Sequence, residues 1–333
     1  MSQKLAHARR TRKMRRRVIL LSAVLAVPAL GGTRRDDVSD SVHTSMASSF
    51  DSVCAVLTDT SSGSGVLINS RWVLTAAHVV YGATASESWL DFGDEIITTG
   101  PWVQGAQFIV HSDYIPGNTN AHLGHDIALI RLDAPLTTIA PSPLFSGSEL
   151  GQTGTIVGYG LSGTGLTGQV DDTYGTKRAG QNVLDVYGSG NSASDDLVFA
   201  DFDRPGVAYQ SSWGSTTPLA YEYASAAGDS GGGLFIEVNG QQQLAGVVSY
   251  GQNGPVHDRD SAADMDYGDV MGFTRVTRFA DWIDDNRADT WTGATTGSFA
   301  SAANWGYGVV PGAGDIARFN TTEAVDVTLA GPV

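Results

Sequence analysis

Three short segments, far apart in the sequence, carry the side-chain types that acyl transfer requires. They are Leu74-Thr75-Ala76-Ala77-His78, Asp126-Ile127-Ala128-Leu129-Ile130 and Gly228-Asp229-Ser230-Gly231-Gly232. Each segment alone would pass for a strand end or a turn. Together they supply a nucleophile, a base that removes its proton and a carboxylate that orients the base.

The chemistry assigns one role to each segment. A serine hydroxyl is too weakly acidic to attack a carbonyl unaided, so His78 must take the proton of Ser230 while Asp126 holds the imidazole in the correct tautomer. The glycines around Ser230 leave backbone N–H groups free to face a developing oxyanion. We therefore predict that His78 is the general base, Asp126 the orienting acid and Ser230 the nucleophile.

The motifs and their order, His then Asp then Ser, resemble the signatures of the chymotrypsin/trypsin family of serine proteases. Further agreements are Trp72-Val73-Leu74, Gly158-Tyr159-Gly160, Ser249-Tyr250-Gly251, Phe273-Thr274-Arg275-Val276 and Asp281-Trp282-Ile283. The resemblance covers about residues 52–287, and it is to a secreted, bacterial-type member.

The resemblance implies an all-β fold of two packed six-stranded antiparallel β-barrels, with a short C-terminal helix and the site between the barrels. It also implies endopeptidase activity on a protein or peptide substrate through an acyl-enzyme. The backbone N–H groups of Gly228 and Ser230 would form the oxyanion hole. This chemistry leads us to expect no cofactor and no metal.

The resemblance also locates the specificity pocket. Its floor lies six residues before the serine, at Ala224, and an alanine cannot pair with a cationic substrate side chain. Ser249, Tyr250 and Gly251 are expected to lie along the substrate, and Met271 to reach the pocket wall unless it belongs to the core. These residues predict a preference for small or apolar side chains at the cleavage position.

The elements that must position these residues are mostly strands. The chain has 41 glycines, and its short apolar runs are separated by turn residues, which indicates β structure. Asn239-Gly240 predicts a type I′ hairpin turn. We expect strands at 53–57, 66–68, 72–75, 103–110, 127–132, 154–159, 233–238, 244–250 and 273–276, a turn at 61–65 and a helix at 278–286.

The N-terminal segment predicts export. A basic run ends at Arg17 and is followed by the uncharged residues 18–30, which is the pattern of a secretory signal and too short for a membrane-spanning helix. We predict a signal peptide at 1–31, a leader at 32–51, the protease domain at 52–287 and a tail at 288–333. The mature protein is expected to be secreted, without stable membrane insertion.

Charge argues against one class of partner. Of the 20 basic residues, ten lie within residues 1–35, so the rest of the chain sets ten basic side chains against 35 acidic ones. A nucleic-acid-binding protein needs a basic surface, so no nucleic acid is expected as a partner.

Cysteine usage and activation depart from the family pattern. Cys54 is alone, in an apolar run, so no intrachain disulfide can form and we expect a buried, inert thiol. No Arg/Lys-Ile-Val-Gly-Gly sequence precedes Val53. In zymogen relatives a freed N-terminus pairs with the aspartate before the serine, here Asp229, and whether Asp229 finds such a partner stays open.

Two further segments carry weaker patterns. The segment 257–269 alternates carboxylates that could bind Ca²⁺, but it lacks the loop pattern of known sites, so a solvated acidic loop is expected. The tail, with Trp291, Trp305 and Phe319, resembles the opening unit of an autotransporter-like β-solenoid repeat. Such units need neighbours to bury a core.

Three alternative interpretations compete with the serine-protease interpretation. Gly228–Gly232 also fits the G-x-S-x-G elbow of α/β-hydrolase esterases, but a hairpin rather than a helix follows it. A catalytically silent binding module on a protease fold is the rival of another class, although none of the three residues is lost. Zinc hydrolysis lacks the H-E-x-x-H motif, and His122 and His125 are expected to be solvated.

Overall fold

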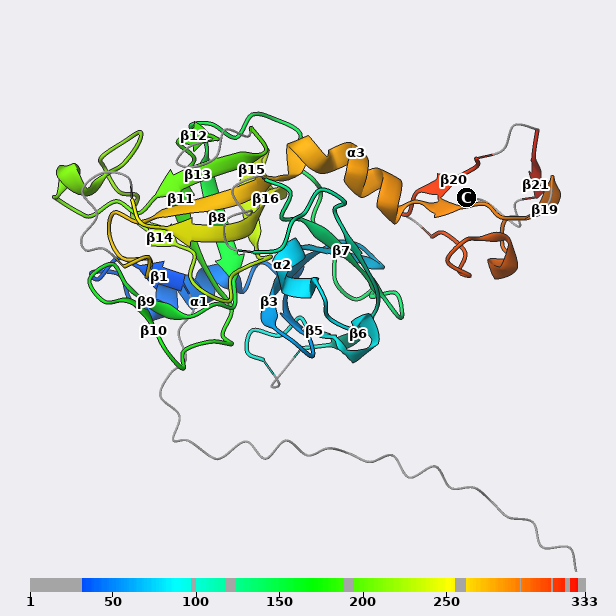
Figure 1. Cartoon of the computed structure of the whole chain (residues 1–333), viewed down its shortest axis with the longest axis horizontal. Coiled ribbons are helices and arrows are strands. Elements are labelled where there is room, and N and C mark those ends of the chain that lie inside the picture. Colours follow the sequence, from blue (N-terminus) through cyan, green and yellow to red (C-terminus); the bar gives the residue numbers. More distant parts are fainter. Residues whose placement is uncertain are drawn as a thin grey trace, which may run out of the picture.

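The computed structural model describes residues 32–96, 100–117, 124–188, 195–254, 262–293, 295–312, 314–320 and 324–328. Two β units lie side by side, and helix α3 (Val276–Arg287) leads from them to a small tail at one end of the molecule (Figure 1). The predicted signal peptide lies outside the described residues.

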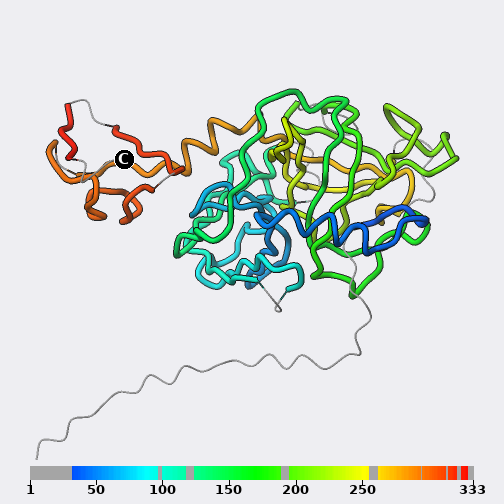
Figure 2. Tube along the Cα trace, turned by 180° about the vertical axis from the view of Figure 1, so that it is seen from behind, coloured from blue at the N-terminus to red at the C-terminus, as the bar shows by residue number. Residues whose placement is uncertain are grey.

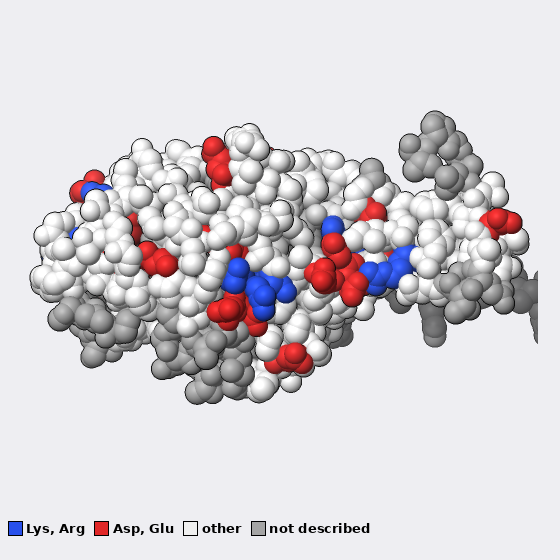
Figure 3. All heavy atoms as spheres, turned by 90° about the horizontal axis from the view of Figure 1, so that it is seen from above, with Lys and Arg blue, Asp and Glu red and all other residues white. Residues whose placement is uncertain are grey.

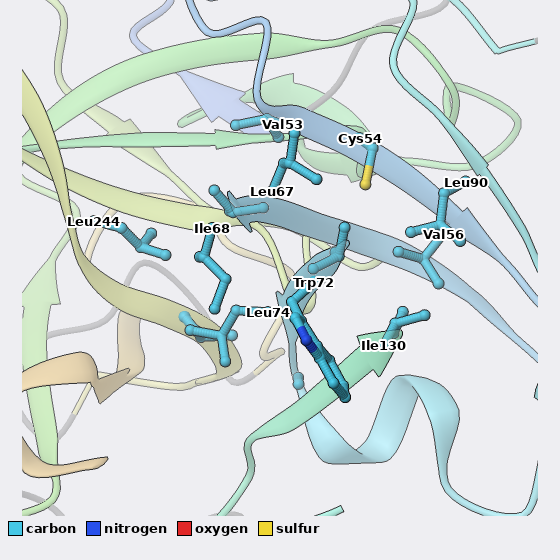
Figure 4. Packing of buried hydrophobic residues seen from close by; sticks show 14 of the residues in the cluster. Val53, Cys54, Val56, Leu67, Ile68, Trp72, Leu74, Leu90, Ile130 and Leu244 are labelled. Atoms are coloured by element: carbon cyan, nitrogen blue, oxygen red, sulfur yellow. The ribbon is translucent and has the colours of Figure 1, made fainter. Parts of the chain in front are cut away.

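The first unit is a closed antiparallel barrel with the strand order β2-β3-β4-β7-β6-β5. Its strands are β2 (Val53–Leu57), β3 (Ser62–Asn69), β4 (Trp72–Thr75), β5 (Trp89–Asp91), β6 (Trp102–Val110) and β7 (Ala128–Leu132). Their apolar side chains fill the interior, and Leu244 of β16 (Gln241–Gln252) points toward the same cluster from the second unit (Figure 4). The two units therefore share part of one core.

The turn predicted at 61–65 is wrong for most of its length, because β3 runs through it. The glycines serve close approach between neighbouring elements instead. A Cβ on Gly63 would lie 2.8 Å from the Ser230 carbonyl oxygen, and one on Gly65 would lie 2.7 Å from the side chain of Val73. Glycine inside a strand marks this kind of contact.

The second unit is a curled antiparallel sheet with the strand order β11-β8-β15-β16-β17-β13-β12. Besides β16, its strands are β8 (Thr153–Gly158), β11 (Arg178–Val183), β12 (Val186–Tyr187), β13 (Leu197–Asp201), β15 (Gly233–Val238) and β17 (Val270–Arg275). Asn239 and Gly240 join β15 to β16 with φ of 52° and 79°, as a type I′ turn requires. The chymotrypsin-like fold class is confirmed, with seven strands paired in this open sheet.

The segment 32–51 packs on the second unit. Its strand β1 (Gly32–Arg34) lies in a four-stranded sheet with β9 (Ser162–Thr164), β10 (Gly168–Val170) and β14 (Tyr223–Ala224). Helix α1 (Asp40–Ala47) lies against β11 (Figure 2). In this contact Asp40 receives two hydrogen bonds, of 2.7 and 2.9 Å, from the buried Arg178.

The helices are few and short. Helix α3 turns Val276, Phe279 and Ile283 toward the core, at a spacing that places them on one face. A four-residue helix, α2 (Ala77–Val80), follows β4, and the described residues also form the 3₁₀ turns η1 (Ala85–Glu87), η3 (Ala208–Gln210) and η4 (Ala302–Asn304). None of the described helices has the length and apolar composition that crossing a bilayer requires.

The tail beyond α3 pairs its strands in parallel. β18 (Asp289–Thr290) pairs with β20 (Ala317–Arg318), and β19 (Thr296–Ser298) pairs with β21 (Asp326–Thr328). The rings of Trp291 and Phe319 lie in tilted contact, with 5.6 Å between their centroids. Parallel pairing of successive turns is the arrangement that a solenoid unit would show, although its kinship with autotransporter repeats stays a prediction.

The charged side chains at the surface bear on the expected partners of the protein. On the face drawn in Figure 3, basic side chains form small groups beside acidic ones and no continuous basic surface. The prediction that no nucleic acid binds remains untested.

Cys54 is fully buried in β2, and burial raises the pKa of its thiol well above the ordinary range, which suits an inert side chain.

Candidate active site

Strand pairing brings the first two predicted residues together. β4 and β7 pair antiparallel with Thr75 opposite Ala128, so the end of β4 lies beside the start of β7. His78 follows β4 in helix α2, and Asp126 lies two residues before β7. The two side chains therefore face each other although 48 positions separate them.

Ser230 reaches the same place through β3. The backbone N–H of Ser64 donates to the Ser230 carbonyl oxygen at 2.8 Å. The Thr75 hydroxyl donates to the Ser64 carbonyl oxygen at 2.7 Å, which ties β3 to the end of β4. Ser230 is half-buried and lines a cavity, and these backbone contacts place it close to the end of β4, the strand that His78 follows.

His78 and Asp126 form a two-point contact. The imidazole Nδ1 lies 2.7 Å from Asp126 Oδ2, and the backbone N–H of His78 donates to Oδ1 of the same carboxylate at 2.9 Å. The Asp126 side chain is fully buried, whereas that of His78 is 37% exposed. With Nδ1 committed to the carboxylate, Nε2 is the nitrogen left to accept a proton.

A β-bulge supplies the next contact to Asp126. In the pairing of β16 with β17 the register shifts between Val248 and Tyr250, so Ser249 is the extra residue. A bulge redirects the side chain that it carries. The Ser249 hydroxyl donates to Asp126 Oδ2 at 2.6 Å, and the Thr274 hydroxyl donates to the Asp126 carbonyl oxygen at 3.2 Å.

The Asp126 carboxylate alters the acidity of His78. Partial burial of the imidazole lowers its pKa, but the hydrogen bond to Asp126 and the negative charge of that carboxylate outweigh this effect. The pKa of His78 is therefore raised above its ordinary value. A more basic imidazole accepts a proton from a hydroxyl more readily.

The glycines on either side of Ser230 hold the loop in a conformation with positive φ. Gly228 and Gly231 have φ of 95° and 84°, which only glycine adopts without strain. Among the described residues, the backbone N–H groups of Gly228 and Ser230 donate to no other residue. Both groups thus remain available to an incoming oxygen.

Asp229 holds this loop from inside. Its carboxylate accepts hydrogen bonds from the backbone N–H groups of Gly160, at 2.7 Å, and Ala226, at 2.8 Å. Burial raises the pKa of Asp229 to about 6, although these two hydrogen bonds oppose the shift. Within the described part of the chain no ion pair is formed by Asp229, so a pairing with a freed N-terminus remains untested.

A cavity of about 180 Å³ opens beside Ser230. Tyr250, Gly251 and Ser249, predicted to line the substrate, border it as expected from their place in β16. None of the lining side chains is charged. They belong to Gln169, Ser225, Ala226, Ala227, Ser230, Val248, Ser249, Tyr250, Gly251, Ala263 and Met265.

Two residues that were predicted to line the specificity pocket lie behind the lining of this cavity. Ala224 and Met271 are fully buried and do not border the cavity. The Met271 sulfur instead accepts the backbone N–H of Ser225 at 3.4 Å, so it supports the lining residue from the core. Met271 is therefore a core residue, which was the alternative to its place in the pocket wall.

The sequence analysis missed Met265, which borders the cavity in their place. A Cβ on Gly251 would lie 2.3 Å from the Met265 sulfur, so the thioether occupies the space that this glycine leaves. Met265 has a φ of 63°, and its backbone is held by Thr33, whose hydroxyl donates to the Met265 carbonyl oxygen at 2.6 Å. No local pattern reveals a contact between residues this far apart.

The acidic segment was predicted to be a solvated loop, and its described part, residues 262–269, contradicts this, whereas residues 257–261 lie outside the described residues. Asp266 and Asp269 are fully buried, and their carboxylate oxygens lie within 4.8 Å of each other and of Asp264. The Asp269 carboxylate accepts the backbone N–H of Met265 at 2.6 Å. These side chains stabilise the loop behind the cavity, whereas His122 lies outside the described residues.

The family model described as Trypsin matches residues 41–283. The chain belongs to the trypsin family. It is a serine endopeptidase, and the α/β-hydrolase alternative is excluded by this match and by the absence of a parallel sheet from the two described β units.

Curated relatives agree with this assignment. Brachyurin from Leptuca pugilator is 32% identical over 223 residues, which is 66% of this chain and 84% of the relative. Collagenase from Hypoderma lineatum is 30% identical over 230 residues, 67% of this chain and 75% of the relative. Phenoloxidase-activating factor 1 from Holotrichia diomphalia is 30% identical over 250 residues, 67% and 60% respectively. All three are animal proteins, so the bacterial-type character stays a prediction.

Proposed function

We propose that this trypsin-family endopeptidase cleaves peptide bonds through an acyl-enzyme on Ser230, with His78 as the base and Asp126 as its orienting acid. The observation that carries the proposal is the 2.7 Å contact of His78 Nδ1 with the buried Asp126 carboxylate, which Ser249 joins to a cavity that Ser230 also lines. A silent binding module would have no need to bury a carboxylate against an imidazole, because such burial is costly unless the pair has a use.

The steps follow from these positions. His78 Nε2 takes the Ser230 proton as the Ser230 oxygen bonds to the substrate carbonyl carbon, and the ionised Asp126 stabilises the resulting imidazolium. The N–H groups of Gly228 and Ser230 donate to the oxyanion of the tetrahedral intermediate. His78 then protonates the leaving amine. Water repeats the sequence on the acyl-enzyme and releases Ser230.

The cavity supports a preference for small or medium apolar side chains at the cleavage position. Its lining holds no charge, and burying an unpaired lysine or arginine there would cost several kcal/mol, about two orders of magnitude or more in binding. Met265 narrows the space next to Gly251. We expect alanine, valine and leucine to be accepted before phenylalanine.

We further propose that the protein is secreted, because its basic and apolar N-terminal segment has the composition of an export signal. A protease outside the cell would act on protein or peptide substrates present there. Export can be tested by expressing the full chain and measuring whether the protein that leaves the cell lacks residues 1–31.

A fluorophosphonate that labels activated serines tests the catalytic assignment. We expect stoichiometric labelling of Ser230, located by mass spectrometry, together with hydrolysis of a peptide with alanine or valine at the cleavage position. Ser146→Ala, an exposed serine elsewhere, serves as the matched control and should label normally. Labelling of a different serine would refute the assignment, and no labelling with no hydrolysis would favour the silent module.

A further inference from the structure

The loop that carries the proposed oxyanion donors is held by a side chain from another part of the fold. Gln169, in β10, accepts the backbone N–H of Ala227 with its Oε1 at 2.9 Å. The backbone N–H of Leu161 donates to the Ala227 carbonyl oxygen at 2.7 Å. Both contacts come from the β9–β10 hairpin and its preceding residue, and both end on the residue before Gly228.

These contacts fix two successive peptide planes. A trans peptide is planar, so the carbonyl of Ala227 and the N–H of Gly228 point in opposite directions. The Leu161 contact therefore directs the Gly228 N–H to the other side of the loop. The Gln169 contact fixes the preceding plane from its N–H side, and the backbone N–H of Asp229 holds the same plane from its carbonyl side, at 3.0 Å from the Ala226 oxygen.

Other contacts hold the neighbouring residues of the loop: the Ser64 hydroxyl donates to the Gly228 carbonyl oxygen at 3.0 Å, and Asp229 accepts the backbone N–H of Ala226. Ala227 itself is exposed, so its backbone depends on the contacts from Gln169 and Leu161. Gln169 is itself well anchored, because its backbone N–H donates to the Asp264 carbonyl oxygen at 2.7 Å and it pairs with Gly163 across the hairpin. The backbone of Gln169 is therefore fixed, and its side chain bonds the exposed backbone of Ala227.

We propose that Gln169 is a positioning residue, which acts through Ala227 to keep the Gly228 N–H directed at the oxyanion. This inference rests on the proposed function of Ser230 and goes beyond it. A donor aimed at the oxyanion strengthens binding of the transition state more than binding of the substrate. Loss of the Gln169 acceptor should therefore lower kcat and leave KM nearly unchanged.

The test compares Gln169→Leu, which removes the acceptor, with Gln169→Glu, which keeps an acceptor oxygen in the same place. Val170→Ala, an exposed neighbour that does not border the cavity, is the matched control. The readouts are kcat and KM on a peptide anilide, the inhibition constant of a peptide boronic acid with the same sequence, and the melting temperature. The boronic acid matters because its tetrahedral adduct places an oxygen between the proposed donors.

We expect Gln169→Leu to lower kcat roughly tenfold, less than the 10²–10³ that follows loss of a donor itself. Its KM should stay within about twofold and the boronic acid should bind roughly tenfold more weakly. Val170→Ala should match the wild type in all of these constants. Gln169→Glu should keep a higher kcat than Gln169→Leu, because it retains the acceptor oxygen, and all variants should melt together.

Three outcomes overturn the proposal. An unchanged kcat in Gln169→Leu would show that the contact of Gln169 with Ala227 does not contribute to catalysis. A raised KM with unchanged kcat would show that Gln169 contacts substrate directly. Equal losses in the Leu and Glu variants with a lower melting temperature would show a structural role only. In each case the wild type still reacts with fluorophosphonate, so the proposed function stands, whereas an unreactive wild type refutes both.

Discussion

Ser230 contributes its hydroxyl to the proposed reaction, while its backbone belongs to the oxyanion site. Ser230→Ala removes the first and leaves the second, so we expect hydrolysis to fall to near background with an unchanged melting temperature. Residual catalysis of ~10³–10⁴ over water is the most that the remaining groups would supply. Steady-state hydrolysis by the purified variant measures this, and activity close to that of the wild type would exclude Ser230 as the nucleophile.

The proton that His78 accepts gives the reaction a pH dependence. The pKa of His78 is raised by Asp126, and only the neutral imidazole can act as the base. Activity should therefore be lost as the solution is acidified, with the midpoint of kcat/KM above about 6.5, the unperturbed value. A pH profile from 5 to 9 measures this midpoint, and a rate that stays constant below 6.5 would contradict the role of His78.

Substitution of Met265 and of Met271 tests which of the two methionines limits the size of the substrate side chain. Met265→Gly should widen the cavity and shift preference from valine toward phenylalanine, and glycine suits the φ of 63° at this position. Met271→Ala should destabilise the fold by about 2–5 kcal/mol, because it leaves a hole in the core, without changing preference. Profiling both variants with one peptide library decides between them, and a shift caused by Met271 alone would reverse the assignment.

At the scale of elements, the sequence predicted most strands of the two β units but missed several short strands and β13, although β13 is a buried apolar run. The bounds of β2, β4 and β15 match their predictions, and the turn at Asn239-Gly240 follows from glycine and asparagine tolerating positive φ. Helix α2 was missed because four residues carry too little periodicity to separate a helix from a strand end.

The candidate site also contains some residues that the sequence predicted and others that it missed. His78, Asp126 and Ser230 could be proposed from the sequence because a motif surrounds each of them. Met265 and Gln169 could not, because their roles arise from contacts across the fold, with Gly251 and with Ala227. A methionine with positive φ is also contrary to local preference, so only tertiary packing can place it there.

The docking of helix α1 on the second unit depends on one buried cation. Arg178 is almost fully buried and donates two hydrogen bonds to Asp40, so Asp40→Asn should destabilise the fold by about 2–4 kcal/mol. Asp37→Asn is the matched control, because its pair with Arg35 lies at the surface and should contribute less than about 1 kcal/mol. Urea unfolding measures both, and equal effects would show that the buried pair has no special weight.

For the whole molecule, the distribution of buried acids sets how stability depends on pH. Four carboxyl groups gather near the end of β13, and burial is the main cause of the rise in each pKa, with the charge of Asp201 adding to it at its neighbours. The pKa is raised to about 8 for Asp185, about 7 for Asp203 and about 9 for Glu222, and it is also raised for Asp201. The folded protein thus keeps protons that the unfolded chain has already released.

The sign follows from this difference. A raised pKa in the folded state contributes stability that is complete below about pH 4 and is lost as the pH rises through the folded values. Between pH 6.5 and 9.5 each such group can remove up to about 1.4 kcal/mol per pH unit while only the folded state holds its proton. We expect the urea midpoint to fall across this range. Glu222→Gln should flatten the fall, because glutamine keeps an acceptor for the Leu219 N–H, which Glu222 binds at 2.6 Å, and cannot ionise.

Glu149→Gln is the control for this prediction. Burial alone would raise the pKa of Glu149, but hydrogen bonds from Arg275, Thr277 and Tyr187 lower it below its ordinary value, so this carboxylate is ionised throughout the range. Its loss should destabilise the protein by a similar amount at pH 6.5 and at pH 9.5. The slope with pH should therefore change in the Glu222 variant and not in the Glu149 variant. A slope that is unchanged in both would show that the buried acids near β13 do not titrate in this range.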